Sequence, residues 1–459
     1  MTSTPTSRLL SLAPELVEHV IKQISKKKDL SNLRLVCSTL DKYAVNELFK
    51  DVFLTPSEEH ISTWNYISEH DAIRRIPRYA TIQTQPDIKN DDFYREDMVE
   101  IGEEFEAAVA ALASFPNIDS LEIAFAPQCL GEEEEEEDDS MFMMERRPDR
   151  KKAFQIIFQA IRNRAGGDNR TIRKLTIINL QNRSIPEFTS SDLFGEVLRH
   201  LDELHIKFIY EENHDAPDND MERVELRTFP AQFIKQWLGP ISSNLRALSV
   251  YHRNSNWGPF PGYWNFSELS FPKLESLTLG YYTIAHDNDI DWILAIKSLR
   301  KLILQNCMIV SWIRFDPDTF VDWKVKAHDW VDLPYESEYE IDDVIEYKSF
   351  SHKGTWAQVF DRFATLPSLE DFQFNYAGPY TEDYGIKQRD NCGRRVFPER
   401  YVTFDEGILP NRWPEADSQG EMESWAEGGF PKNMHKEELE ADQASLDSFI
   451  KGLGNGREE

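Results

Sequence analysis

The segment LAPELVEHVIKQISKKKDLSNLRLVCSTLDKYAVNELFKDVF, residues 12–53, predicts three short helices in succession. Its first part carries an apolar side chain at every fourth position, which aligns these side chains on one face of a helix. Pro14 falls in the first turn, where its missing N–H costs nothing. Ser38 followed by Asp41 predicts a capping box at the start of the third helix. The aligned apolar positions are Leu12, Leu16, Val20 and Ile24.

Three helices in so short a segment bury little surface. Residues 12–53 nevertheless hold more apolar positions than a small core can use. We therefore expect part of its apolar surface to face a partner. The residues resemble an F-box: a Leu-x-Pro-Glu-Leu start, the run Leu33–Cys37, then Leu-Phe and Val. The family usually has proline directly after the first leucine, where this chain has Ala13. An N-terminal helical cap on the following domain is the alternative.

The resemblance implies that residues 1–53 dock onto a SKP-family adaptor of a cullin-RING ubiquitin ligase. Residues 1–50 hold eight Lys and Arg against five Asp and Glu, on a chain with a net charge of −30. A basic unit suits an acidic partner, and the resemblance implies that the adaptor is acidic. Electrostatic attraction of this kind favours fast association. The expected adaptor-binding residues are Leu12, Pro14, Leu16, Val20, Leu33, Val36 and Cys37.

The strongly acidic composition argues against nucleic acid and against an anionic membrane surface, because both need clustered Lys and Arg. No apolar run approaches the length of a membrane span, and the first residues lack a secretory signal. Four scattered cysteines, without metal-ligand spacing, predict reduced thiols and a cytoplasmic or nuclear protein.

Beyond residue 101, apolar residues recur at positions k, k+3 and k+5, and most copies follow an amphipathic stretch. Helix followed by strand, repeated, predicts α/β units. The Leu-x-x-Leu-x-Leu core resembles leucine-rich repeats. A compact α/β domain without repeats is the alternative. The seven copies are Ile118/Leu121/Ile123, Ile172/Leu175/Ile177, Leu201/Leu204/Ile206, Leu245/Leu248/Val250, Leu274/Leu277/Leu279, Leu299/Leu302/Leu304 and Leu369/Phe372/Phe374.

The predicted fold class is therefore α/β: a three-helix F-box followed by an irregular leucine-rich-repeat-like α/β solenoid with long insertions. We expect the F-box at residues 1–53, a linking helical and loop segment at 54–100, and the solenoid at 101–380. Two insertions interrupt it, an acidic one at 131–150 and an aromatic and acidic one at 314–353. The aromatic side chains of the second are expected to pack on the repeats, and binding to a partner is the alternative. Residues 381–459 are expected to form a partly disordered tail, with a helix near 436–451 and a part that caps the solenoid.

The sequence holds no nucleotide-binding loop, no Gly-x-Ser-x-Gly elbow and no His-Glu-x-x-His motif. The histidines are scattered, and no basic neighbour activates Cys307. We therefore expect no cofactor, no metal and no catalysis by this chain.

Strand alternation predicts a polar solenoid face suited to a protein target. Aromatic side chains are the better anchors on such a face. The expected target-binding residues are Tyr251, Tyr281, Tyr282, His205, Gln305 and Gln373.

The leading hypothesis is the substrate receptor of an SCF-type ubiquitin ligase. One alternative is an F-box-like protein-interaction scaffold that does not direct ubiquitination. The other is an unrecognised α/β hydrolase.

Overall fold

A computed structural model describes most of the chain. The described residues are 9–86, 101–127, 129, 145–164, 168–209, 224–252, 257–258, 263–333, 347–375, 395–396, 400–405 and 436–455.

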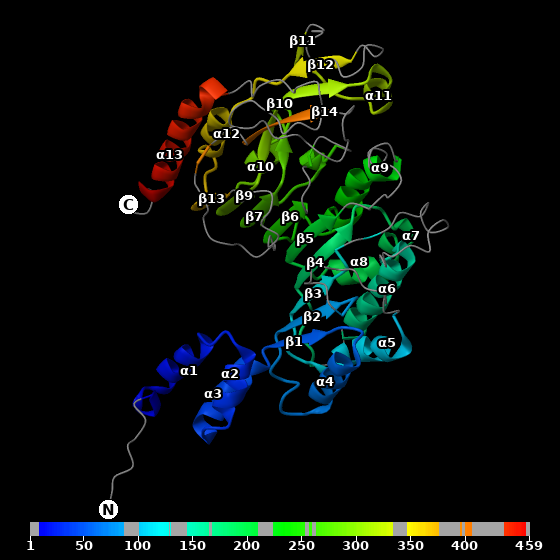
Figure 1. Cartoon of the computed structure of the whole chain (residues 1–459), viewed down its shortest axis with the longest axis vertical. Coiled ribbons are helices and arrows are strands. Elements are labelled where there is room, and N and C mark those ends of the chain that lie inside the picture. The colour runs from blue at the N-terminus through cyan, green and yellow to red at the C-terminus, as the bar shows by residue number, and fades with distance from the viewer. Residues whose placement is uncertain are drawn as a thin grey trace, which may run out of the picture.

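The centre of the molecule is a nine-stranded sheet in which every neighbouring pair of strands is parallel. Its strand order follows the chain, so each unit adds one strand beside the last (Figure 1). The strands are β1 (Asp51–Leu54), β2 (Tyr79–Gln83), β3 (Ser120–Ala124), β4 (Lys174–Gln181), β5 (Glu203–Ile209), β6 (Ala247–His252), β7 (Ser276–Gly280), β9 (Lys301–Gln305) and β13 (Asp371–Asn375).

Helices and short turns connect these strands, and in the lower half of Figure 1 the helices cover one side of the sheet. The α-helices are α4 (Glu58–Glu69), α5 (Glu103–Ala110), α6 (Arg147–Arg164), α7 (Pro186–Thr189), α8 (Asp192–Leu198), α9 (Val224–Phe233), α10 (Asp291–Leu294) and α12 (Trp356–Phe363). Shorter turns are η2 (Ala111–Ser114), the π-helical η5 (Ile234–Leu238) and η6 (Phe266–Glu268).

All seven predicted strands are present, as β3, β4, β5, β6, β7, β9 and β13, and all lie in this one sheet. The residues at k, k+3 and k+5 are buried in every copy and belong to the main core. Large apolar side chains at these positions anchor each strand to the helix layer, which explains why strand and helix alternate.

The expectation of a linking segment at residues 54–100 is wrong for its described part. The sheet begins at Asp51, and β1, α4 and β2 form its first unit. Val52 and Leu54 enter the main core with Trp64 of α4, whose indole N–H donates to the carbonyl of Ala108 at 2.8 Å. These residues are therefore part of the sheet rather than a connection to it.

The N-terminal unit consists of η1 (Leu9–Ser11), α1 (Pro14–Lys22), α2 (Lys27–Arg34) and α3 (Ser38–Leu48). The three predicted helices are present, and Pro14 lies in the first turn of α1. The predicted capping box is wrong, because Cys37 is the N-cap of α3 and no side chain caps that end. Asp41 instead accepts a 2.9 Å hydrogen bond from Arg34 Nε.

A second, five-stranded sheet includes two strands of the predicted insertion at 314–353, together with strands that lie before and after it. Strand β10 is central and pairs antiparallel with β12 and parallel with β8 and β14. Trp330 and Phe350 are buried in the core of this second sheet rather than on the repeats, so the expected packing of the insertion on the repeats is wrong for these residues. The elements are β8 (Thr283–Ile284), β10 (Met308–Phe315), α11 (Pro317–Asp322), β11 (Val331–Leu333), β12 (Lys348–Ser351) and β14 (Tyr401–Asp405).

The C-terminal helix α13 (Leu439–Asn455), preceded by η9 (Lys436–Glu438), packs against α12 beside the last strand of the sheet (Figure 1). Leu446 and Phe449 enter the main core, so this helix packs at the end of the sheet. Most of the predicted acidic insertion and most of residues 381–434 lie outside the described residues. No helix in the described part of the chain is both long and apolar enough to cross a membrane.

Candidate docking surfaces

The core of the N-terminal unit is filled without Leu12, Leu16 and Val20 of the predicted apolar row, whereas Ile24 at the end of that row packs against the core. Five buried residues fill it, contributed by all three helices: Val17, Ile21, Leu30, Leu40 and Ala44. Leu16 in the predicted row is 53 % exposed, because the core lies one position further round the helix, at Val17 and Ile21. This unit therefore buries one apolar stripe and leaves a second one in solvent.

Six of the ten large hydrophobic side chains that are exposed in the described chain lie between residues 10 and 36. Single exposed apolar residues are normal, whereas such a concentration is a candidate interaction surface. We define the apolar docking face as Leu10, Leu12, Leu16, Val20, Leu35 and Val36.

The predicted adaptor-binding residues divide between this face and the core of the unit. Leu12, Pro14, Leu16, Val20 and Val36 are exposed. Leu33 and Cys37 are half-buried and pack against the core, so they support the unit from inside. The sequence interpretation missed Leu10 and Leu35, although Leu35 is the most exposed of the set at 87 %.

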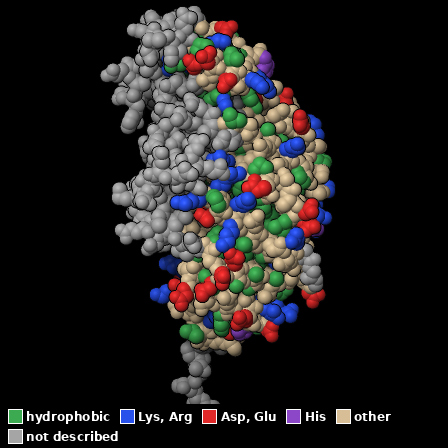
Figure 2. Space-filling model, turned by 90° about the vertical axis from the view of Figure 1, so that its right-hand side faces the viewer, with side chains coloured by type: hydrophobic (Ala, Val, Ile, Leu, Met, Phe, Trp, Pro, Cys, Tyr) green, Lys and Arg blue, Asp and Glu red, His purple; other side chains and the backbone are tan. Residues whose placement is uncertain are grey.

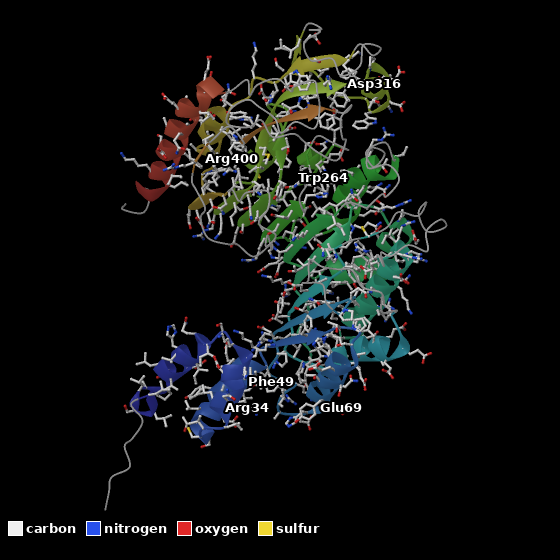
Figure 3. The ribbon with its side chains drawn as sticks, in the orientation of Figure 1. Arg34, Phe49, Glu69, Trp264, Asp316 and Arg400 are labelled. Carbon is white, nitrogen blue, oxygen red and sulfur yellow. The ribbon has the colours of Figure 1, made fainter. Side chains whose placement is uncertain are left out.

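The N-terminal unit is joined closely to the sheet. Only Phe49 and Lys50 separate α3 from β1, and Phe49 packs against the main core. The guanidinium of Arg34 lies 5.6 Å from the centre of the Phe49 ring, and both residues sit at this junction in Figure 3. The Lys50 carbonyl accepts a 2.9 Å hydrogen bond from the backbone N–H of Arg78. These contacts lie at the connection between the N-terminal unit and the sheet.

The helix-bearing side of the molecule shows a different surface. Figure 2 shows acidic, basic and apolar side chains interspersed there, without a gathering of one kind. Much of the net negative charge lies in acidic runs outside the described residues, such as Glu132–Asp139. An intermixed surface of this type is suited to solvation.

The opposite face of the sheet carries a row of aligned polar side chains, which we call the open face. Strand register places Thr176, His205, Ser249 and Thr278 side by side on β4 to β7. Gln373 of β13 continues the row beyond Ile303 of β9. His205 and Gln373 are half-buried, and target binding by them stays a prediction.

The expectation that three tyrosines anchor a target on this face is wrong on accessibility. Tyr251 is 1 % exposed because its ring lies across Gly280 of the neighbouring strand, where an added Cβ would come within 1.8 Å. Tyr281 is buried against Tyr251, with ring centres 5.5 Å apart. Tyr282 belongs to the main core, and its hydroxyl donates to the Asp289 carbonyl at 2.9 Å.

Gln305 is also buried, so it is not presented to a partner. Its carbonyl accepts a 2.8 Å hydrogen bond from the backbone N–H of Tyr281. Tyr251, Tyr281, Tyr282 and Gln305 are therefore part of the packing of the sheet and not of its accessible surface.

Charged side chains on the open face are paired with one another. Lys174 Nζ lies 2.9 Å from Glu203 Oε2, and His205 Nε2 lies 3.5 Å from the same oxygen. The interaction with His205, followed by that with Lys174, lowers the pKa of Glu203 to about 2, against the effect of partial burial. The charge of this carboxylate is therefore satisfied inside the protein.

Acidification is expected to remove a stabilising contribution of Glu203. The folded-state pKa of about 2 lies below the ordinary 4.5, so the contribution is full above pH 4.5 and is lost between pH 4.5 and 2. Because the side chain is partly exposed, the expected loss is about 1 kcal/mol. Chemical denaturation at several pH values should show a shallower acid dependence for Glu203→Gln. Equal acid dependence in both proteins would contradict the assignment.

Ser249, His205 and Glu203 bring a hydroxyl, an imidazole and a carboxylate together, since Ser249 Oγ lies 2.8 Å from His205 Nδ1. A catalytic serine also needs hydrogen-bond donors aimed at the developing oxyanion. β5, β6 and β7 are hydrogen-bonded to one another along this row, so their backbone N–H groups are engaged in the sheet. Those N–H groups are therefore not available as oxyanion donors. The cysteine alternative is weaker, because burial raises the pKa of Cys307 to about 12 and keeps the thiol protonated.

The chain matches no protein-family model, and no curated protein matches it at a significant level. The docking face and the open face are therefore interpreted from their own chemistry and from the sequence resemblance.

Proposed function

We propose that the chain is the substrate-recognition subunit of an SCF-type cullin-RING ubiquitin ligase. In this proposal the N-terminal unit is an F-box that binds a SKP-family adaptor, and the following leucine-rich-repeat-like sheet holds a target protein. The observation that carries it is the exposed apolar docking face on a unit whose own core is already filled. The resemblance of the same segment to an F-box supplies the identity of the partner.

The proposed role needs no catalytic residue in this chain. A receptor accelerates ubiquitin transfer by holding the target near the ubiquitin-loaded enzyme, which raises its effective concentration. The short junction at Phe49 and Lys50 favours this role, because a connection of two residues limits how far the docking face can move relative to the sheet.

Affinity purification with quantitative mass spectrometry tests the proposal in cells. The intact chain should co-purify with the adaptor, a cullin and a set of further proteins. The Leu16→Asp variant should lose the adaptor and the cullin while keeping the further proteins. Val321→Asp is the matched control, because Val321 is 68 % exposed on α11 and lies outside the docking face. The proposal would be contradicted if both variants kept the adaptor.

The half-life of a co-purified target separates the receptor from a scaffold that does not direct ubiquitination. A receptor predicts that Leu16→Asp lengthens this half-life, and a scaffold predicts no change. A hydrolase is the second candidate, favoured by the contact between Ser249 and His205. It predicts that a fluorophosphonate probe labels the intact chain and that Ser249→Ala abolishes the labelling, whereas the receptor proposal predicts no labelling of Ser249.

A further inference from the structure

Three loop segments meet at one end of the second sheet and bring His and Asp side chains together. His286 and Asp287 follow β8, Asp329 precedes β11, and His352 follows β12. The pairing of Ser351 with Val331 and of Ile284 with Ile309 places these strand ends at the same edge. Donor atoms of Asp287, Asp329 and His352 all lie within 4.8 Å of one another.

His352 is oriented as a metal-binding imidazole. Its ring is buried, and Nδ1 lies 3.0 Å from the carbonyl oxygen of Val310, so Nδ1 carries the proton and donates to that oxygen. The lone pair of Nε2 then faces the carboxylate of Asp287, whose Oδ1 is 3.5 Å away. A backbone carbonyl that fixes the tautomer in this way is the usual support of a histidine ligand. A ring nitrogen and a carboxylate oxygen at this distance can share a proton or bind a cation between them.

The Asp329 carboxylate is held in place from two sides. Its Oδ1 lies 2.5 Å from His286 Nδ1, and its Oδ2 accepts a 2.8 Å hydrogen bond from the backbone N–H of Asp287. The His286 ring is fixed in turn by stacking on Trp330, with ring centres 4.8 Å apart and an interplanar angle of 3°. The oxygens of Asp329 are therefore presented to the cluster in a fixed orientation.

Other charged groups near the cluster are already engaged. Arg362 pairs with Asp291 and donates to the carbonyl of Asp287. Asp289 accepts from the backbone N–H groups of Ala285 and His286 at 2.8 and 2.9 Å. The two carboxylates of Asp287 and Asp329 thus give the cluster a charge that matches a divalent cation.

We propose that Asp287, Asp329 and His352 bind one divalent transition-metal ion. One imidazole and two carboxylates suit Zn²⁺ and its first-row neighbours better than Ca²⁺ or Mg²⁺, which favour oxygen donors alone. Tetrahedral donors around Zn²⁺ stand about 3.4 Å apart, given bonds of about 2.1 Å, so the separation of up to 4.8 Å closes with a small side-chain rotation. Asp287 can make that rotation, since its side chain is 74 % exposed.

A cavity of about 390 Å³ lies beside the cluster and is lined by His286, Asp287 and His352 together with residues of α12. It provides a path for the ion and room for a water ligand. Gly354 leaves space for the His352 ring, because a Cβ at residue 354 would come within 2.5 Å of it. The bound ion would connect β8, β11 and β12 at the place where the second sheet meets the first.

His328 is excluded from the ligand set by its position. It stacks on His286 with ring centres 4.7 Å apart and an interplanar angle of 16°. Its ring nitrogen groups with His286 and Asp329 and not with Asp287 and His352, so it lies outside the proposed ligand set. His328 is also exposed, so it serves as a matched control that leaves the fold unchanged.

Titration of the chelator-treated full chain with Zn²⁺ tests the site, using isothermal calorimetry and a rise of the melting temperature as readouts. We expect one tightly bound equivalent, and binding to the folded state raises the melting temperature with Zn²⁺ concentration. Asp287→Asn and His352→Gln should each weaken binding at least about tenfold, whereas His328→Gln should leave it unchanged. Because Asp287 is largely exposed, its variant is expected to fold normally.

Any of three results would overturn the proposal. One is the absence of a stoichiometric Zn²⁺ equivalent, which would leave Asp329 as the acceptor of a purely structural hydrogen-bond network. The second is equal affinity in the intact chain and Asp287→Asn, and the third is an equal loss in His328→Gln and His352→Gln. A Co²⁺-substituted sample provides a spectroscopic check, since the visible absorption of the bound ion should disappear in His352→Gln and persist in His328→Gln.

Discussion

Replacing Leu16 with Asp is expected to weaken binding of the purified chain to a SKP-family adaptor by about 100-fold or more. Burial of one leucine side chain contributes roughly 1.5–3 kcal/mol, and a carboxylate at the same place adds a desolvation cost. Together these exceed the roughly 2.7 kcal/mol that corresponds to 100-fold in affinity. Isothermal calorimetry with the purified adaptor measures the change directly.

The same substitution is expected to leave the N-terminal unit folded. Leu16 lies outside the core formed around Val17 and Ile21, and an acidic side chain near the start of α1 is favourable for the helix dipole. The melting temperature should therefore match that of the intact chain. Val321→Asp, the exposed control on α11, should retain full affinity. Full affinity of Leu16→Asp would contradict the assignment of this face.

Replacing Trp356 with Ala is expected to lower the free energy of unfolding by about 3–5 kcal/mol, as truncation of a fully buried tryptophan does. The side chain is 0 % exposed, and its ring packs against Phe374 with ring centres 4.7 Å apart. Its indole N–H donates to the carbonyl of Arg400 at 3.0 Å, so the truncation also leaves that acceptor without its donor.

The position of Trp356 explains why the expected loss is large. The Tyr401 hydroxyl accepts from the Trp356 backbone N–H at 3.1 Å and donates to Asp442 of α13 at 2.5 Å. Arg400, labelled in Figure 3, lies beside β13 and donates to the Asn375 carbonyl at 3.1 Å. Trp356 therefore joins the last strand of the first sheet, the second sheet and the C-terminal helix.

Chemical denaturation monitored by far-ultraviolet circular dichroism measures this loss of free energy, because the backbone signal does not depend on the replaced tryptophan. Tyr66→Ala is the matched control, because Tyr66 is 61 % exposed on α4 and its loss should change the free energy of unfolding by less than about 0.5 kcal/mol. Hydrogen exchange should show faster exchange in α13 for Trp356→Ala. A loss below about 1 kcal/mol would contradict the central role of this side chain.

The sheet was largely predictable from the sequence, because its strands repeat one apolar spacing. Phe49, Val52 and Leu54 carry the same spacing at β1, but Phe49 and Val52 were assigned to the N-terminal unit because they complete its motif, and Leu54 was assigned to the linking segment. At β2 the corresponding residues are Pro77, Ala80 and Ile82, and small side chains at these positions weaken the signal. The boundary was therefore misplaced where two patterns overlap or where side chains are small.

The docking face could be predicted because α1 has more apolar positions than its core can bury. The sequence could not predict which of the two apolar stripes of α1 is buried. Leu16 and Val17 differ by one helical position, and packing against α2 and α3 decides between them. The tyrosines were misjudged for a related reason. Side-chain alternation identifies a strand face, but the ring of Tyr251 is buried by its neighbour Gly280, which only the register reveals.

The His and Asp cluster was missed because its residues are distant in sequence. His286-Asp287 and His328-Asp329 repeat a His-Asp pair, and His352 stands alone, so no regular ligand spacing exists. The second sheet brings them together through the pairing of β8, β10, β11 and β12. Long-range strand pairing of this kind leaves no local periodicity to detect.

The docking of an adaptor on the apolar face of the N-terminal unit is tested most directly by hydrogen–deuterium exchange of the full chain with and without a purified SKP-family adaptor. The account predicts slower exchange in residues 9–48, centred on α1 and on the turn between α2 and α3 at Leu35 and Val36. It predicts unchanged exchange in β3 to β7 of the sheet. Unchanged exchange in residues 9–48 at saturating adaptor, or protection confined to the sheet, would contradict it.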